Sequence, residues 1–442
     1  MKTVLRIALP LMLQQLISVS VNLVDNLMVG SLGDAAIGSV AAVNKFYMIA
    51  VFGVNGLTAA GAVFIAQFFG AQQERKMKES FRVMLVCSAV IMFLFTLTAA
   101  FLHEPILRYY TDDPAVIAAG SAYLQLALYS FLPTAVTLCI YSAMRAVGEM
   151  QIPLRTSVGA VLMNAVLNYI LIYGKLGFPQ MGIRGAAMAT LLARLLEMVF
   201  ALFMLKRKPF AFKTKLTEIA DISPDLFRQV IVKAAPLMLN EILWSFGMAT
   251  IFKFYASRGS DVMSGDSIAG TISDLFFTMF GGMAAASTVL ISTPLGANRL
   301  DEARDNAYRL IGFSVFLALL FAALIFASSF LVPVLYANVS AGAQKVAMQF
   351  IRITSVMFWI YMASTECYFI LRAGGDMKHT LLMDSGFMWG LTIPVMAALT
   401  YLTNADYLLI YIAGQMIDFV KLLFSYWLVR REHWVVNLTV QE

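Results

Sequence analysis

Long apolar segments follow one another along this whole chain. A helix needs about 20 apolar residues to cross the hydrocarbon core of a bilayer, and such segments recur from the first residues to the last. Only 13% of the 442 residues are charged, against about a quarter in a typical soluble protein. Because so few charges could not cover the surface of a soluble fold of this size, the sequence predicts an all-α membrane protein.

The apolar segments predict twelve membrane spans. These cover residues 6–30, 44–70, 80–102, 119–147, 153–174, 182–205, 231–256, 265–296, 308–336, 344–373, 380–402 and 407–430. The first apolar run has no small-residue cleavage site after it, so we interpret it as an uncleaved span and not as a signal peptide.

Lysine and arginine residues concentrate in alternate connections between these spans. They are dense in 75–82, 206–233 and 299–309, and sparse in the connections of the opposite set. Cytoplasmic connections carry the excess of basic residues in membrane proteins, so we expect a protein of the cell membrane with both termini in the cytoplasm. The net charge of +6 is then a topology signal and indicates no nucleic-acid partner.

The tetrapeptide PLML at Pro10 returns at Pro236, 226 residues later. At the same offset Gly56 falls on Gly282, and the polar loop GAQQERKMKES falls on GANRLDEARDN. With one residue of slippage, YSAMRAVGEM falls on YFILRAGGDM, and Arg194 falls on Lys421.

A constant offset through polar loops predicts an internal repeat of six spans. We therefore expect an N-terminal lobe of residues 1–205, a basic cytoplasmic linker of residues 206–230 and a C-terminal lobe of residues 231–442. Because an offset of six spans keeps the orientation, the lobes should be parallel and related by a pseudo-twofold axis along the membrane normal. Such repeats are typical of transporters that bind their substrate near the bilayer midplane.

Three segments of the chain resemble one known family. They are ALPLMLQQLISVSVNLVDNLMVGSLG, the two Arg-Ala-x-Gly-Glu/Asp turns, and NAVLNYILIYGKLGFPQMGIRGAAMAT. In these segments the chain resembles the multidrug and toxic compound extrusion (MATE) transporters of the MOP flippase superfamily. The resemblance implies export of organic cations and other amphipathic compounds by H⁺ or Na⁺ antiport. It also implies two six-helix lobes that form a V and alternate between inward- and outward-facing states.

Ionisable residues inside a bilayer are costly and are functional candidates by default. Asp25 lies in the first span, 19 residues past Arg6. Asn164 and Asn168 lie four residues apart in the fifth span and thus share a helix face. We expect Asp25 and Asn168 to meet at similar depth in the N-terminal lobe. The resemblance implies a cation site that pairs a first-span Asp with fifth-span polar residues. Many members have Asp where this chain has Asn168, so Asp25 is the expected single charge.

The C-terminal half has three acidic candidates at similar depth. With a rise of about 1.5 Å per residue, Glu241 lies about 12 Å into the seventh span. Glu366 and Asp384 each lie about 9 Å into their spans. If their faces converge, they form a carboxylate cluster that binds Na⁺ or a proton, and the resemblance supports Glu241 best. The opposing interpretation is hydration near the interface, or pairing with Arg372 and Lys378.

Two further acids, Asp418 and Asp274, are weaker candidates. Asp418 lies three residues before Lys421 on one helix face, and this spacing predicts a simple ion pair. Asp274 lies near the outer end of the eighth span.

A lipid or lipid-linked saccharide flippase of the same superfamily is the alternative function. A basic cavity would suit its anionic cargo, whereas the intramembrane charges here are mainly acidic. An intramembrane enzyme would need a nucleophile or metal motif, and we find no H-E-x-x-H, G-x-S-x-G or clustered histidine.

These patterns together fix the expected partners. We expect a monomeric transporter without enzymatic activity, with small amphipathic or cationic substrates, membrane lipids around it and no cofactor. The coupling ion is H⁺ or Na⁺, and Na⁺ would bind at Asp25 or Glu241.

Overall fold

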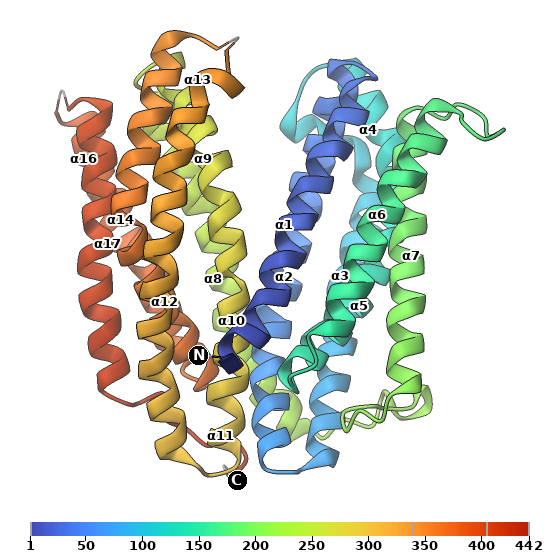
Figure 1. Cartoon of the computed structure of the whole chain (residues 1–442). Coiled ribbons are helices and arrows are strands. Elements are labelled where there is room, and N and C mark those ends of the chain that lie inside the picture. The colour runs from blue at the N-terminus through green and yellow to red at the C-terminus, as the bar shows by residue number, and fades with distance from the viewer. Residues whose placement is uncertain (1, 338, 404, 441–442) are drawn as a thin grey trace. The chain divides into compact units, whose positions relative to one another are not determined.

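The computed structural model describes residues 2–337, 339–403 and 405–440, and every element in that part of the chain is helical (Figure 1). The first half comprises α1 (Lys2–Gly30), α2 (Asp34–Gly70), α3 (Glu74–Tyr110), α4 (Pro114–Ala127), η1 (Leu128–Ser130), α5 (Phe131–Ala146), α6 (Gln151–Tyr173), α7 (Ile183–Arg207) and η2 (Leu216–Glu218). The second half comprises α8 (Pro224–Ala256), α9 (Ser260–Phe280), α10 (Gly282–Ser287), η3 (Thr288–Ser292), α11 (Thr293–Gly296), α12 (Leu300–Ser328), η4 (Ser329–Leu331), α13 (Val332–Leu335), α14 (Ala341–Ala373), α15 (Met377–Leu381), η5 (Leu382–Gly386), η6 (Met388–Thr392), α16 (Ile393–Tyr401) and α17 (Tyr407–Arg430).

Eleven helical stretches of the described residues are long and apolar enough to cross a membrane. The twelfth, α1, contains a shorter apolar helix, Arg6–Val21. The prediction of an all-α membrane protein is therefore confirmed. The helices run further into polar sequence than predicted: α8 begins at Pro224, inside the predicted linker. Proline suits the first turn of a helix, and the negative charge of Asp225 there is stabilised by the positive end of the helix dipole.

The chain divides into two compact units. The N-terminal unit is Leu13–Met238, and the C-terminal unit is Met1–Met12 with Leu239–Glu442. In the N-terminal unit α2 packs on α3, α4 and α5, and α6 packs on α7. In the C-terminal unit α14 packs on α9, α12 and α17. Both changes of unit fall inside a PLML segment, between its Met and its Leu.

The two glycines that coincide in the repeat make equivalent close contacts. A Cβ at Gly56 would lie 2.7 Å from the backbone N of Met238, within the N-terminal unit. A Cβ at Gly282 would lie 2.8 Å from the carbonyl O of Ala8, within the C-terminal unit. Glycine is needed at both positions because a helix backbone approaches closely.

Residues with a positive φ angle also recur at equivalent positions of the two halves. Left-handed residues recur at the same offset as the sequence, in the pairs Gly33 and Gly259, Gln72 and Asn298, and Gly148 and Gly375. Turns with the same handedness therefore close equivalent helix ends in both halves.

The acidic residue of each Arg-Ala-x-Gly-Glu/Asp turn caps the next helix. Glu149 accepts hydrogen bonds from the backbone N–H groups of Gln151 and Ile152, and Asp376 accepts one from His379 N–H. Burial raises the pKa of the Glu149 carboxyl, but the Lys208 ammonium and the two N–H donors outweigh this effect and hold its pKa below the usual range. A capping carboxylate explains why this turn carries an acid in both halves.

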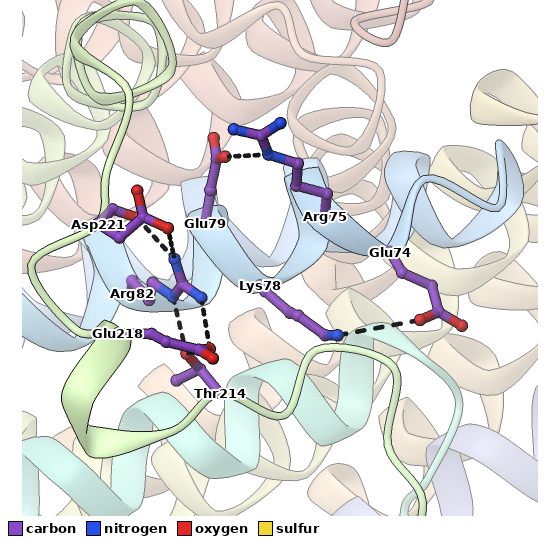
Figure 2. Close-up of polar contacts among 8 residues, drawn as sticks. All are labelled: Glu74, Arg75, Lys78, Glu79, Arg82, Thr214, Glu218 and Asp221. Atoms are coloured by element: carbon purple, nitrogen blue, oxygen red, sulfur yellow. Dashed lines mark hydrogen bonds and ion pairs between the residues drawn. The ribbon is translucent and has the colours of Figure 1, made fainter.

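A buried arginine of α3 makes several hydrogen bonds to the segment after α7. The Arg82 side chain is 6% exposed and extends from α3 toward the segment that contains η2 (Figure 2). Its guanidinium donates to Thr214 Oγ1 at 2.7 Å, to the Asp221 carbonyl O at 2.6 Å and to Glu218 Oε2 at 2.9 Å. Arg82 therefore adds polar contacts to a segment whose Phe212 is buried against Phe81 of the same helix.

Replacing Arg82 by alanine should loosen this segment without unfolding the helices. Hydrogen bonds to charged groups contribute about 1.5–3 kcal/mol. We take the lower end because the Glu218 and Asp221 side chains are 39% and 74% exposed. We expect roughly tenfold faster trypsin cleavage between residues 206 and 215 in inside-out vesicles. Lys78→Ala is the control, since its 4.0 Å contact with Glu74 is exposed. Equal cleavage of both variants would contradict this role.

Candidate functional site

The N-terminal unit contains a cavity of about 280 Å³. Its walls come from α1, α2, α4, η1, α5, α6 and α7. The lining residues are Asp25, Val43, Asn44, Tyr47, Met48, Tyr123, Ala127, Ser130, Phe131, Ala160, Val161, Asn164, Thr190, Ala193, Arg194 and Glu197. We call this the N-terminal cavity.

Asp25 and the two asparagines lie together in this unit. The Asn168 Nδ2 donates to Asp25 Oδ1, and it lies 3.4 Å from Asn164 Oδ1. Asn168 is fully buried, whereas Asp25 and Asn164 are partly buried and line the cavity. The Asn168 Oδ1 has no hydrogen-bond partner among the described residues. A carboxylate and amide oxygens are the hard ligands that a small cation prefers.

The N-terminal cavity has a second carboxylate that the sequence reasoning missed. Glu197 on α7 lines the same cavity as Asp25, and its side chain is only 3% exposed. The Arg194 Nη1 lies 2.8 Å from Glu197 Oε2, and the Tyr141 hydroxyl donates to Glu197 Oε1 at 3.2 Å. Two ionisable residues three apart within the predicted sixth span were the signal that could have found this pair.

The C-terminal unit contains a smaller cavity of about 210 Å³. It is lined by α8, α14, η5 and α17. The lining residues are Asn240, Glu241, Trp244, Tyr361, Thr365, Tyr368, Phe369, Arg372, Met383, Asp384 and Lys421. We call this the C-terminal cavity, and it brings together two of the three predicted acids, Glu241 and Asp384.

Asp384 is held firmly, whereas Glu241 is not. The Lys421 Nζ lies 2.8 Å from Asp384 Oδ1, and Asn240 Nδ2 donates to Asp384 Oδ2 at 3.0 Å. The sequence predicted Asp418 as the partner of Lys421, so that prediction is corrected. The Asp384 carboxylate, on the neighbouring η5, is the one within ion-pair distance of the ammonium. In the part of the chain that the structure describes, Glu241 has neither a hydrogen bond nor an ion pair.

Asp384 lies in a widened helical turn. The π-helical segments η5 (Leu382–Gly386) and η6 (Met388–Thr392) precede Pro394, which lies at the start of α16. Proline has no N–H to donate to the preceding turn, and π-helical turns are frequent at functional sites. The same arrangement precedes Pro294, where Asn306 Nδ2 donates to the Leu290 carbonyl O that proline leaves free.

Glu366 lies apart from the other two acids. It does not line the C-terminal cavity, it is fully buried in α14, and Ser287 Oγ lies 2.5 Å from its Oε1. Glu366 therefore does not join the expected carboxylate cluster, and the opposing interpretation, hydration near the interface or pairing with Arg372, does not describe it either, because neighbouring helices enclose this side chain. The Arg372 guanidinium instead stacks on the Tyr368 ring, with 5.5 Å to the centroid.

The polar groups of the two units occupy equivalent positions of the repeat. At an offset of 226 or 227 residues, the pairs are Gln14 and Asn240, Tyr141 and Tyr368, Arg145 and Arg372, and Arg194 and Lys421. The bases coincide, but the acids do not: Glu197 is on the helix of its base, and Asp384 is on another helix. Each unit therefore contains a base and a carboxylate beside a cavity.

The two cavities differ in formal charge. Within the described residues, no group of three or more His, Cys, Asp or Glu residues could hold a metal ion. The charged groups lining the N-terminal cavity are Asp25, Glu197 and Arg194, so their formal sum is −1. Those lining the C-terminal cavity are Glu241, Asp384, Arg372 and Lys421, so their formal sum is zero.

Comparisons with known proteins agree with this architecture. The MatE family model matches residues 10–170 and 236–398. A probable multidrug resistance protein NorM from Bradyrhizobium diazoefficiens is 30% identical over 297 residues, which span 66% of this chain and 63% of that relative. The probable multidrug resistance protein YoeA from Bacillus subtilis is 21% identical over 94% of this chain and 90% of its own length.

Solved structures show the same fold. A crystal structure of MATE in complex with MaL6 has a TM-score of 0.88 at 19% identity, covering 98% of this chain and 96% of that chain. A MOP superfamily transporter from Pyrococcus furiosus has a TM-score of 0.87 at 19% identity, covering 98% and 95%. The family model covers well over half of the chain. This multi-pass membrane protein therefore belongs to the MATE family of transporters.

Proposed function

We propose that this protein is a multidrug efflux transporter that exchanges a cation, H⁺ or Na⁺, for organic cations and other amphipathic compounds. The relatives' names, multidrug resistance protein NorM and YoeA, support the substrate class. The basic connections at 75–82, 206–233 and 299–309 support a cell-membrane location with cytoplasmic termini. We further propose that it works as a monomer.

The observation that carries the proposal is a partly buried carboxylate in each cavity. Asp25 in the N-terminal cavity is hydrogen-bonded only through amide groups, with no base in ion-pair contact among the described residues. Glu241 in the C-terminal cavity has no such base either, although Arg372 lines the same cavity. A carboxylate in a poorly hydrated cavity without a close counter-ion favours uptake of a cation or a proton.

Coupling requires that cation and substrate influence each other's binding. In the exchange we propose, the outward-facing state takes up the cation at a carboxylate, which weakens substrate binding and promotes release. The inward-facing state releases the cation and takes up substrate. Each ligand then shifts the equilibrium between the outward-facing and inward-facing states only as far as its affinities for these two states differ.

Purified protein in proteoliposomes tests this function. An imposed pH or Na⁺ gradient should drive accumulation of an amphipathic fluorescent cation against its own gradient, and only one of the two ions should support it. Vesicles without gradient and vesicles without protein are the controls. Substrate accumulation that is the same with and without either gradient would contradict cation coupling.

The bases in the C-terminal cavity support a second candidate function, that of a lipid or lipid-linked saccharide flippase. Arg372 and Lys421 both line it, and bases suit an anionic headgroup. The same vesicles, loaded with a fluorescent anionic lipid, distinguish the two functions. Gradient-independent lipid movement, together with no cation accumulation, would favour the flippase.

A further inference from the structure

The Arg194–Glu197 pair has no role in the exchange described so far, although it lines the same cavity as Asp25. Glu197 is 3% exposed, yet the Arg194 side chain is 39% exposed. The carboxylate is thus enclosed in the wall, whereas part of its partner's side chain faces the cavity. A side chain that faces a cavity has room to turn away from its partner without displacing packed neighbours.

The groups around the pair fix the carboxylate and leave the base replaceable. Glu197 accepts a hydrogen bond from Tyr141 through Oε1, whereas Arg194 contacts its other oxygen, Oε2. The other titratable or charged groups that face the pair come from neighbouring helices; they are Asp25, Tyr47, Tyr123 and Arg145. Asp25 is the second acid among these, and all of the bases are arginines, which stay protonated in proteins.

Residue 168 is an asparagine, so the neighbour of Asp25 is an amide and carries no charge. The Asn168 Oδ1 is fully buried and has no hydrogen-bond partner among the described residues. A cation there would meet the Asp25 carboxylate and the amide oxygens of Asn164 and Asn168. Asp25 alone compensates the charge of a monovalent cation, but burying a cation stays costly while its ligands are few, so a further oxygen ligand from the same cavity would stabilise it.

We propose that Glu197 is the second carboxylate of the cation site in the N-terminal cavity, and that Arg194 is a tethered counter-ion that neutralises Glu197 while no cation is bound. When the coupling cation enters, Arg194 releases Glu197 and moves toward the open part of the cavity. The cation then binds between Asp25 and Glu197. This inference rests on the proposed exchange and names its ligands.

The repeat supports this assignment independently. Lys421 stands at the position equivalent to Arg194 and pairs with Asp384, which lines the other cavity. Both halves thus place a base at one point of the sixth span of the repeat and pair it with a cavity carboxylate. The acids come from different helices, so the arrangement is not explained by repetition of one helix.

Three variants test whether Glu197 binds the cation directly, only stabilises the fold through its ion pair, or only attracts the cation through its charge. The readout is the concentration of the coupling cation that half-saturates substrate exchange in proteoliposomes. Glu197→Gln should raise this concentration roughly tenfold or more, and Arg194→Gln should lower it by a similar factor, because the tethered competitor is gone. Arg194→Lys keeps the charge and should stay within about threefold of the unmodified protein.

The double variant Glu197→Gln with Arg194→Gln is decisive. The double variant has the same formal cavity charge as the unmodified protein. If Glu197 acts only through its charge, the half-saturating concentration should therefore return to that of the unmodified protein. A direct ligand predicts that it stays roughly tenfold raised, as in Glu197→Gln. Glu104→Gln and Arg108→Gln are the matched controls, since that ion pair on α3 is 52% and 63% exposed.

The outcomes distinguish this inference from the proposed function. If Glu197→Gln leaves the half-saturating concentration unchanged while Asp25→Asn shifts it, the inference is wrong and the exchange stands. If neither changes it, the inference is wrong and the cation site lies outside the N-terminal cavity; the exchange itself fails only if substrate movement by the unmodified protein does not depend on the cation. If Glu197→Gln does not reach the membrane, Glu197→Asp replaces it; its shortened side chain should raise the value roughly threefold, and no change would overturn the inference.

Discussion

Replacing Asp25 by asparagine should abolish gradient-driven export while the protein still folds and reaches the membrane. The substitution keeps the shape of the side chain and an amide contact to Asn168, but it removes the charge that a coupling cation needs. Coupling free energies between two ligands are typically about 1–3 kcal/mol. We therefore expect a loss of roughly 100-fold in the initial rate of export.

The readout that separates coupling from folding is gradient-independent substrate binding. We expect Asp25→Asn to bind a fluorescent amphipathic cation with nearly normal affinity, and to lose the weakening of that affinity by the coupling ion. Asn168→Ala is the comparison, because it removes the hydrogen-bond donor and keeps the charge. Export by Asp25→Asn at the normal rate would exclude Asp25 from the cation site.

Replacing Glu241 by glutamine should lower export by roughly 10- to 100-fold for cationic substrates. Glu241 is the acid of the C-terminal cavity that no base holds in ion-pair contact among the described residues, and Trp244, Tyr361 and Phe369 line that cavity with it. Aromatic rings beside a carboxylate suit an organic cation, because the rings attract positive charge and the carboxylate neutralises it. We expect the apparent affinity for cationic substrates to fall more than that for neutral ones.

Asp384→Asn provides the contrast within the same cavity. Asp384 is held by Lys421 and Asn240, so its removal leaves a buried ammonium unpaired and should lower the amount of folded protein. Glu241→Gln should leave that amount unchanged. Equal losses of cationic and neutral substrates in Glu241→Gln would assign Glu241 a structural role.

The helices could be predicted from the sequence because the bilayer imposes their length and their apolar composition. The polar partners could not, since they depend on which helix faces which. Lys421 shows this: the i, i+3 spacing favours Asp418, yet the facing turn at Asp384 provides the ion pair. Depth along a helix grouped Glu366 with Glu241 and Asp384, but it did not reveal that Ser287 and the surrounding helices bury Glu366 away from their cavity.

The internal repeat carried more information than any single charge. It aligned Gly56 with Gly282, and the structure gives each a helix backbone at van der Waals distance or closer from an added Cβ. It aligned Arg194 with Lys421, and both pair with cavity carboxylates. It did not align the unpaired acids, because Asp25 corresponds to Ile251 and Glu241 to Gln15. The fold is thus duplicated, whereas the charges of the two cavities diverge.

The most direct test measures both fluxes of the exchange in one population of vesicles. Substrate accumulation and counter-movement of the coupling cation are followed together, with unmodified protein and with Asp25→Asn. The account predicts a fixed ratio of cation to substrate in the unmodified protein, and the loss of both fluxes in the variant. Substrate accumulation without cation movement, or an unchanged ratio in Asp25→Asn, would contradict it.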